Sequence, residues 1–225
     1  MDGRHEVKHY IIVADYYALR ARLGTVLKCD SHAGTDGTYL VRSLYFDTCE
    51  DRVLYEKLDG VRDRDKYRLH YYDYNTEFIQ LEKKSKHSDL CVKRSERITR
   101  EEVIRILDGN IGWMKKDERP LLKELYGKME KEHLMPKTIV DYTRDPFVFP
   151  AGNVRVTLDH HIRAGMGWQD FLKPDAVTIP IPEDPVILEV KWDHFLPDVV
   201  KAAVQTPNRQ ASAFSKYAAC RIYDF

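Results

Sequence analysis

Residues 78–86 read FIQLEKKSK, in which the apolar residues Ile79 and Leu81 alternate with the polar residues Gln80 and Glu82. Ile79 and Leu81 fall on one side of this segment, while Glu82 and Lys84 fall on the other. Because successive side chains of a strand point to opposite faces of a sheet, this period of two predicts a β-strand with one buried face. The same spacing places the acid and the lysine side by side on the polar face.

This alternation recurs along the whole chain and predicts eight strands. In six of these strands polar side chains of one parity oppose apolar side chains of the other. In the remaining two, Lys93, Ser95 and Arg97 share a parity, as do Val140, Tyr142 and Arg144. The predicted strands span residues 4–11, 43–47, 66–72, 78–86, 93–97, 140–144, 154–159 and 188–193. Short strands at hairpin distances, with helices inserted between them, predict an antiparallel, β-rich α+β domain.

Helix signals interrupt the strand pattern. Asp15 is expected to cap a helix near the N-terminus, because a short polar side chain there precedes an apolar stripe. Thr99 and Glu102 form a capping box, and Pro120 suits the first turn of a third helix. The remaining segments are two short helices and a loop rich in glycine and proline, expected near residues 199–205, 209–219 and 165–185.

Composition narrows the class of protein. The 225 residues include 36 basic and 36 acidic side chains, so the formal net charge is zero and argues against nonspecific nucleic-acid binding. The first residues do not resemble a signal peptide, and no apolar run approaches the length of about 20 residues that spans a membrane. The four cysteines show no close pairing, which favours reduced thiols in a cytoplasm. A single domain over residues 1–225 is expected, because no repeat or linker divides the chain.

The polar faces of the predicted strands are rich in lysine and arginine. An acid precedes a lysine by two residues three times, so the two side chains lie together on one face. The cations are Lys8, Arg68, Lys84, Lys93, Arg144, Arg155 and Lys191, and the acid–lysine pairs are Glu6–Lys8, Glu82–Lys84 and Glu189–Lys191.

Two interpretations of these faces remain open. If the faces converge inside a closed barrel, they form a positively charged channel with a few acidic points. Uncompensated cations are costly in a low-dielectric interior, and a triphosphate or polyphosphate would relieve that cost, while the carboxylates would hold a divalent metal. If the sheet is open, the same residues form a solvated face with ion pairs worth less than about 1 kcal/mol each.

Other chemical sites have weaker support. His160 and His161 are adjacent in the chain, so in a strand their side chains should point to opposite faces and should not share a metal. Ser215 precedes Lys216 without a partner base, which argues against a nucleophile. The sequence contains neither GxxxxGK[ST] nor GxGxxG after a strand, so P-loop and Rossmann nucleotide sites are not expected.

Nine short motifs, in order along nearly the whole chain, resemble the polyphosphate polymerase domain of the vacuolar transporter chaperone family. This family is a branch of the triphosphate tunnel metalloenzymes. Each motif alone is weak, and the resemblance depends on their order. The motifs are RHEVK (4–8), SLYFDT (43–48), KYR (66–68), LEKK (81–84), VK (92–93), YTR (142–144), RVTLD (155–159), LEVK (188–191) and SKY (215–217).

The resemblance implies an eight-stranded antiparallel β-barrel tunnel with flanking helices, which binds ATP and polyphosphate and transfers the γ-phosphate of ATP to the growing chain. The implied phosphate ligands are Lys8, Arg68, Lys84, Lys93, Arg144, Arg155, Lys191 and Lys216. The implied further substrate contacts are Ser215, His70, Lys66 and Tyr142. The implied metal is Mn²⁺ or Mg²⁺, held by Glu189, with Glu6 and Glu82 as further candidates.

The chain departs from the family pattern in two respects. His70 stands where the family usually has a second arginine, so one phosphate contact is expected to be weaker or pH-dependent. The N-terminal regulatory domain and membrane helices of eukaryotic members have no counterpart in these residues, which is typical of a stand-alone bacterial domain in the cytoplasm. A membrane-protein partner for polymer export is an expectation from the resemblance, and the oligomeric state stays open.

Two other functions would use the same residues. A hydrolase of the same superfamily would cleave triphosphate or polyphosphate with the same cations and metal, with water as the acceptor. A non-catalytic module would bind polyphosphate without turnover. The residues do not separate these alternatives from the polymerase.

Overall fold

The computed structural model describes residues 4–87, 90–206, 210–211 and 213–223, which form two compact units. Unit 1 comprises Met1–Leu40, Tyr142–Arg163 and Pro180–Lys216, and unit 2 comprises Val41–Asp141, Ala164–Ile179 and Tyr217–Phe225. Each unit consists of antiparallel strands and helices.

The sheet of unit 1 is built around β1 (His5–Ile11). Its strand order is β11-β1-β10-β8-β7, with β2 paired to β7. The short strand β9 pairs with β8, and its first two residues belong to unit 2. The long strands β7 and β8 also contribute residues to unit 2. The bounds are β2 (Lys28–Cys29), β7 (Met135–Phe149), β8 (Val154–Gly165), β9 (Thr178–Pro180), β10 (Val186–Trp192) and β11 (Gln210–Ala211).

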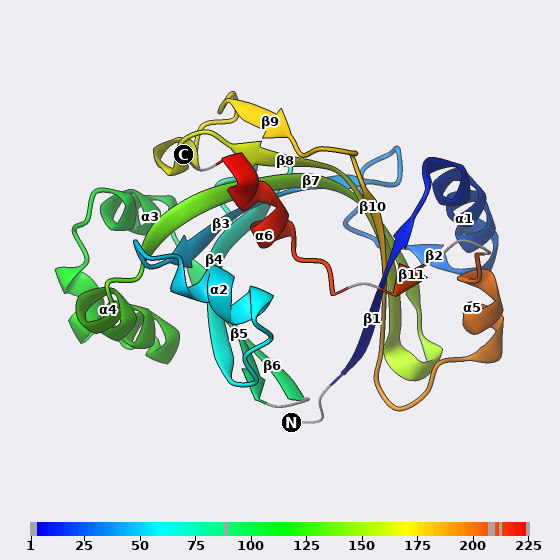
Figure 1. The fold of residues 1–225 in the computed structure, drawn as a ribbon, viewed down its shortest axis with the longest axis horizontal. Coiled ribbons are helices and arrows are strands. Elements are labelled where there is room, and N and C mark those ends of the chain that lie inside the picture. The colour runs from blue at the N-terminus through cyan, green and yellow to red at the C-terminus, as the bar shows by residue number, and fades with distance from the viewer. Residues whose placement is uncertain (1–3, 88–89, 207–209, 212, 224–225) are drawn as a thin grey trace. The chain divides into compact units, whose positions relative to one another are not determined.

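Two helices cover one face of this sheet, α1 (Val13–Val26) and α5 (Asp198–Ala203), which Figure 1 shows together on one side of β1 and β10. Leu19 and Leu23 of α1 and Val200 of α5 form one buried cluster with Val156 of β8 and Leu188 of β10. Burial of these apolar side chains fixes which parity of each strand faces the helices. The polar parity therefore faces away from α1 and α5.

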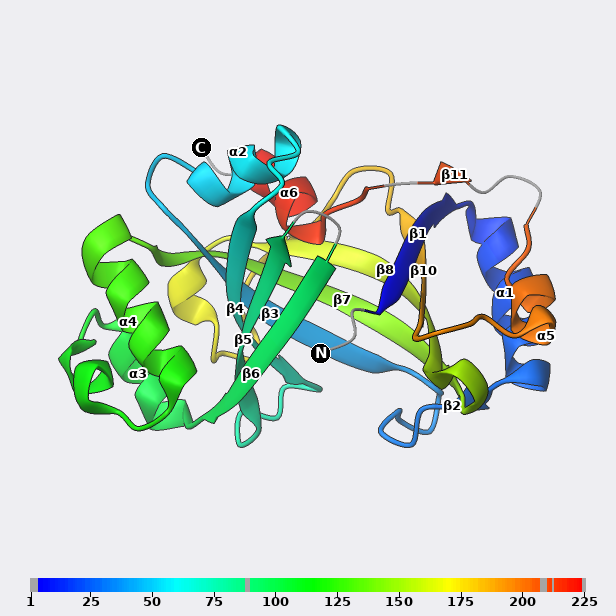
Figure 2. The same cartoon turned by 90° about the horizontal axis from the view of Figure 1, so that it is seen from below.

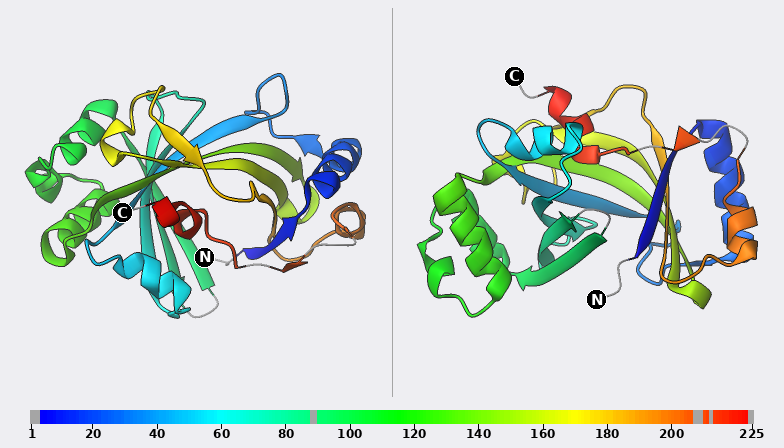
Figure 3. Two further views of the ribbon diagram at one scale, coloured as in Figure 1. Left: turned by 45° about the horizontal axis from the view of Figure 1, so that its top comes forward. Right: turned by 60° about the horizontal axis from the view of Figure 1, so that its bottom comes forward.

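Unit 2 has the strand order β7-β3-β4-β5-β6, and Figure 2 shows β4, β5 and β6 side by side. Its apolar face is covered by α3 and α4, which Figure 3 shows as a green pair. Leu44, Leu69 and Leu81 of the strands are buried with Val103 of α3 and Leu121 of α4. The bounds are β3 (Tyr39–Asp47), α2 (Arg52–Leu58), β4 (Arg64–Tyr72), β5 (Ile79–His87), β6 (Leu90–Ile98), α3 (Arg100–Leu107), α4 (Pro120–Glu132) and α6 (Lys216–Cys220).

All eight predicted strands are present, and the α+β class with antiparallel strands and flanking helices is confirmed. The capping box of α3 is also confirmed, since Thr99 accepts from the Glu102 amide and the Glu102 side chain accepts from the Thr99 amide. Pro120 begins α4 as expected. Four 3₁₀ turns occur among the described residues, at Gly112–Lys116, Ala151–Asn153, Trp168–Asp170 and Arg221–Tyr223.

Three helix predictions need correction. Asp15 does not cap α1, because the helix begins at Val13 and Asp15 lies inside its first turn. The helix expected over 209–219 begins only at Lys216, and residues 210–211 form the edge strand β11, while 207–209 and 212 lie outside the described residues. The loop expected over 165–185 contains the short strand β9. No helix among the described residues is long and apolar enough to cross a membrane.

Candidate functional site

Polar side chains of β1, β10 and β8 stand in register on the face of unit 1 that points away from α1 and α5. The apolar neighbours of these residues, such as Val156, Leu188 and Val190, are buried under the helices. The polar side chains form two rows across the three strands, Glu6–Lys191–Arg155 and Lys8–Glu189–Thr157. We call this surface the polar face of unit 1.

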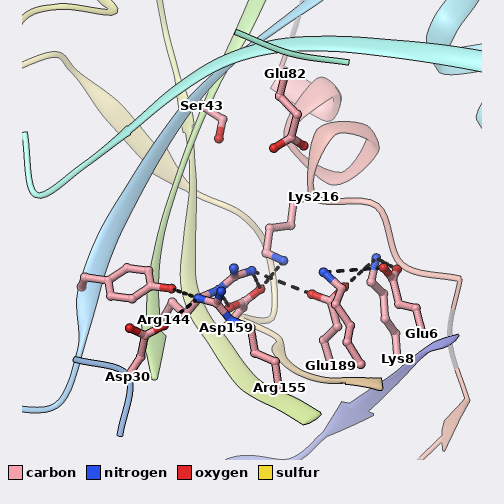
Figure 4. Close-up of polar contacts among 12 residues, drawn as sticks. Glu6, Lys8, Asp30, Ser43, Glu82, Arg144, Arg155, Asp159, Glu189 and Lys216 are labelled. Carbon is pink, nitrogen blue, oxygen red and sulfur yellow. Dashed lines mark hydrogen bonds and ion pairs between the residues drawn. The ribbon is translucent and has the colours of Figure 1, made fainter. Parts of the chain in front are cut away.

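Glu189 lies at the centre of this face and is only 5% exposed. One carboxylate oxygen is 3.0 Å from the ammonium of Lys191. The same oxygen is 3.6 Å from the ammonium of Lys8 (Figure 4). The other oxygen is 3.8 Å from the guanidinium of Arg144. Burial alone would raise the pKa of Glu189, but the charges of Lys8, Lys191 and Arg144 outweigh it and hold this pKa well below its usual value. Glu189 is therefore a carboxylate at neutral pH.

Glu6 shares both lysines with Glu189. Its carboxylate is 2.8 Å from Lys8 and 3.6 Å from Lys191. Two carboxylates and two ammonium groups thus form one compact ion cluster at the β1–β10 pair, because residues opposite one another on paired strands lie about 5 Å apart.

Asp159 organises a second cluster on the same face. It is 0% exposed, and its two oxygens lie 2.6 and 2.7 Å from Nε and Nη2 of Arg144. Lys216, the first residue of α6, is 2.5 Å from the same carboxylate (Figure 4). Burial opposes ionisation, but Arg144 and Lys216 lower the pKa of Asp159 below its ordinary value. Asp159 was not among the site residues predicted from the sequence, although it shares the parity of Arg155.

Tyr142 lies beside both cations of this cluster. The ammonium of Lys216 is 4.5 Å from the centre of its ring, and the guanidinium of Arg144 is 5.2 Å from it. These distances are those of cation–π contacts, which hold a cation without neutralising its charge. Ser215 directly precedes Lys216 and is half-buried.

Arg155 lies at the end of β8 nearest the 30–38 loop. Its guanidinium donates to the hydroxyl of Tyr39 at 2.6 Å and is 3.2 Å from the carboxylate of Asp30. Neither Tyr39 nor Asp30 was expected at the site. Both come from outside the strand that carries Arg155, so no strand periodicity could have identified them.

Unit 2 presents a polar face of the same kind. Arg68 contacts both oxygens of the buried carboxylate of Glu82 at 3.1 Å, and Lys93 lies 2.6 Å from it. Burial would raise the pKa of Glu82, but the charges of Arg68 and Lys93 outweigh it, so the pKa is lowered. Lys84 stands between Lys66 and Lys93 in the register of β4, β5 and β6.

His70 also belongs to the polar face of unit 2. It pairs with Ser43 of β3 and Gln80 of β5, and it is only 1% exposed. Of the site residues predicted from the sequence, unit 1 holds Glu6, Lys8, Tyr142, Arg144, Arg155, Glu189, Lys191, Ser215 and Lys216, and unit 2 holds Lys66, Arg68, His70, Glu82, Lys84 and Lys93.

The cations of unit 1 are balanced by carboxylates, which Lys8, Lys191, Arg144 and Lys216 all contact. One expectation needs correction. His160 and His161 do not point apart, because the backbone of His161 has a φ of 50° and turns the two rings to a centroid distance of 4.6 Å.

The carboxylates of unit 1 fit a divalent metal in one specific manner. Among the described residues no group of three or more His, Cys, Asp or Glu side chains could hold an ion by itself. Mg²⁺ is commonly bound through only one or two carboxylates together with phosphate oxygens of the substrate. Glu189 and Glu6, which share two lysines, provide such a pair.

The fold is similar to that of solved structures. It is similar to a candidate adenylate cyclase from Bacillus halodurans, with 11% identity over 92% of this chain and 96% of that chain and a TM-score of 0.51. The chain is also similar to a candidate adenylate cyclase from Vibrio parahaemolyticus. The identity is 11% over 89% of this chain and 82% of that chain, with a TM-score of 0.44. The fold is the triphosphate tunnel fold, also called CYTH-like.

The sequence identifies the family. The profile of the VTC domain matches residues 3–223, and the chain belongs to the VTC domain family. The resemblance found in the nine motifs is thereby confirmed. No curated protein matches the chain.

Proposed function

We propose that this protein synthesises polyphosphate by transferring the γ-phosphate of ATP to the terminal phosphate of a growing polyphosphate chain. One observation carries the proposal: in a VTC domain, five cations and a buried carboxylate lie on a single polar face. The cations are Lys8, Arg144, Arg155, Lys191 and Lys216, and the carboxylate is Glu189.

The reaction makes mainly electrostatic demands on the protein. The attacking terminal phosphate is already anionic, so no strong general base is required. Two unit charges about 4 Å apart interact by about 4 kcal/mol at an effective dielectric constant near 20, and the triphosphate of ATP must closely approach the end of the polyphosphate chain. Lysine and arginine side chains offset this repulsion and stabilise the negative charge on the equatorial oxygens of the transferred phosphate.

Arg144 and Lys216 suit this role because both are already oriented. Asp159 binds Nε and Nη2 of Arg144, which leaves the Nη1 donors of the planar guanidinium for phosphate oxygens. Lys216 has three N–H donors, of which Asp159 takes one. The two cations can therefore bind adjacent oxygens of one anion.

A bound divalent metal would neutralise negative charge on the phosphate oxygens. Glu189 would hold this metal, with Glu6 as the second carboxylate and phosphate oxygens completing the coordination. Mn²⁺ and Mg²⁺ both suit such a set of oxygen ligands. Glu82 is the corresponding buried carboxylate of unit 2.

The distribution of cations favours a long anion over a single triphosphate. Within unit 1, polar-face lysines or arginines occur on β1, β7, β8 and β10, and Lys216 adds another at the start of α6. A hydrolase gains nothing from contacts along a long product, whereas a polymerase keeps its product bound through successive additions. The proposal places this reaction in the cytoplasm and leaves export of the polymer to a membrane-protein partner.

The test is incubation of the purified protein with ATP and Mn²⁺, followed by measurement of ADP, orthophosphate and polymer-bound phosphate. We expect nearly one polymer-bound phosphate for each ADP, and a shorter lag when a short polyphosphate primer is added. Release of nearly all γ-phosphate as orthophosphate from the earliest times would identify a hydrolase. Binding of polyphosphate without any ADP would identify a non-catalytic module.

A further inference from the structure

We propose that Asp159 is a positioning residue that competes with bound phosphate for Arg144 and Lys216 and thereby limits the affinity of the site for polyphosphate. This inference rests on the proposed function, because it concerns the same anion. In the ligand-free protein Asp159 holds the two cations in place. When phosphate binds, the two cations are shared between Asp159 and the ligand.

The contacts of Asp159 support this role. Its side chain is 0% exposed, and its oxygens contact Nε and Nη2 of Arg144 and Nζ of Lys216 at 2.5 to 2.7 Å. The three groups come from three different elements, namely β7, β8 and the first residue of α6. A single buried carboxylate therefore brings together two cations that are far apart in the sequence.

The two cations remain accessible to a ligand although Asp159 does not. The side chains of Arg144 and Lys216 are 14% and 12% exposed, and each keeps donors that Asp159 does not use. An anion at these donors lies close to the Asp159 carboxylate and is repelled by it. Charge at position 159 should therefore weaken phosphate binding, while the shape of the side chain keeps the donors oriented.

The variant that separates charge from shape is Asp159→Asn. It removes the nearest counter-ion of Arg144 and Lys216, so the melting temperature of the ligand-free protein should fall. The same change removes the repulsion, so the Kd for tripolyphosphate should decrease by about tenfold. If Asp159 had a purely structural role, Asp159→Asn would lower the melting temperature and leave the affinity for tripolyphosphate unchanged or weaker. Calorimetric titration with tripolyphosphate in EDTA measures this affinity without any contribution from metal.

Asp141→Asn provides the matched control. Asp141 is also buried and forms a close ion pair, with Arg42 at 2.7 Å, but this pair lies in unit 2, on the side of its strand opposite to Tyr142. This variant should lose stability as Asp159→Asn does, with the Kd for tripolyphosphate unchanged. A decreased Kd in both variants would show that loosened packing sets the affinity, and would overturn the proposal.

The other outcomes are equally decisive. An unchanged or increased Kd in Asp159→Asn overturns the proposal, while wild-type binding still supports the proposed function. Absence of tripolyphosphate binding to the wild type overturns both. If Asp159→Asn does not fold, the double variant Asp159→Asn/Lys216→Gln restores the local charge balance. It should bind more tightly than Lys216→Gln alone, and equal or weaker binding overturns the proposal.

Discussion

Thr157 occupies the row of Lys8 and Glu189 and is only 3% exposed. Its hydroxyl has no hydrogen-bond partner among the described residues. A buried hydroxyl in that state costs about 1–3 kcal/mol. Thr157→Val has nearly the same shape and removes this cost, so the ligand-free protein should melt at a higher temperature. Thr157→Ser, which keeps the hydroxyl, is the control and should not raise it, and a lower melting temperature for Thr157→Val would contradict the prediction.

Glu189→Gln tests the proposed metal ligand at constant size. A neutral amide binds divalent cations much less well than a carboxylate, so turnover that depends on Mn²⁺ should be lost. Activity across a Mn²⁺ titration, together with thermal melting to verify folding, measures this effect. Glu6→Gln should reduce activity less, because Glu6 is the second carboxylate of the pair. Unchanged turnover in Glu189→Gln would mean that Glu189 does not hold the metal, and Glu6 and Glu82 would be the next carboxylates to test.

The lowered pKa of Glu82 predicts a pH dependence of stability. A carboxyl whose pKa is lower in the folded than in the unfolded protein stabilises the fold above its unfolded pKa, which is about 4. This contribution is lost as the pH falls from about 4 towards the folded pKa. Urea unfolding at pH 7, 5 and 3 should show a smaller acid-induced loss in Glu82→Gln than in the wild type. Equal losses would mean that Arg68 and Lys93 do not stabilise the charged form.

Helix α3 is the element whose local sequence signal was most complete. Thr99→Ala removes the capping hydroxyl and should lower the free energy of unfolding by about 1 kcal/mol. Thr35→Ala, at an exposed threonine outside any helix, is the control and should have little effect. Chemical denaturation measures both variants, and turnover should change in neither. Equal stability of Thr99→Ala and wild type would contradict a stabilising capping box.

Helix α2 shows why other elements could not be predicted. Asp51, the N-cap residue directly before this helix, makes no side-chain capping bond. The first amides are instead bound by Asp47, which accepts from Val53 at 2.8 Å and from Leu54 at 3.0 Å. Asp47 is itself buried at the end of β3 and also accepts from Tyr217 at 2.5 Å. A cap supplied from the preceding strand leaves no signal in the spacing that defines an N-cap.

The residues of the candidate site also divide into those that the sequence predicted and those that it could not predict. The cations on strands were predictable because alternation alone determines which face a residue occupies. Their partners were not, because Asp159, Asp30 and Tyr39 become neighbours only through strand order and the path of the 30–38 loop. The prediction that His160 and His161 point to opposite faces was wrong for a related reason. The positive φ of His161 breaks the alternation on which that prediction depended.

At the scale of the whole molecule, a polyanion that binds only the folded protein must raise its stability. Tripolyphosphate at about 100 times its Kd should add about 2.7 kcal/mol to the free energy of unfolding. Thermal melting with increasing tripolyphosphate at low salt measures this effect, with sodium sulfate at equal ionic strength as the control. A melting temperature that does not respond would indicate that the cations line a solvated face.

The near-balance of charge on the polar face of unit 1 also affects which polyanions reach it. Five cations lie there with four carboxylates, Glu6, Asp30, Asp159 and Glu189, so their sum is one positive charge. Such a face exerts little long-range attraction, and what remains is screened within about 8 Å at physiological ionic strength. Nucleic acids, which are attracted from a distance by uniformly basic surfaces, should therefore compete poorly. Discrimination among polyanions then depends on short-range contact. An anion must be slender and have a high enough charge density to displace the carboxylates of this face from their cations.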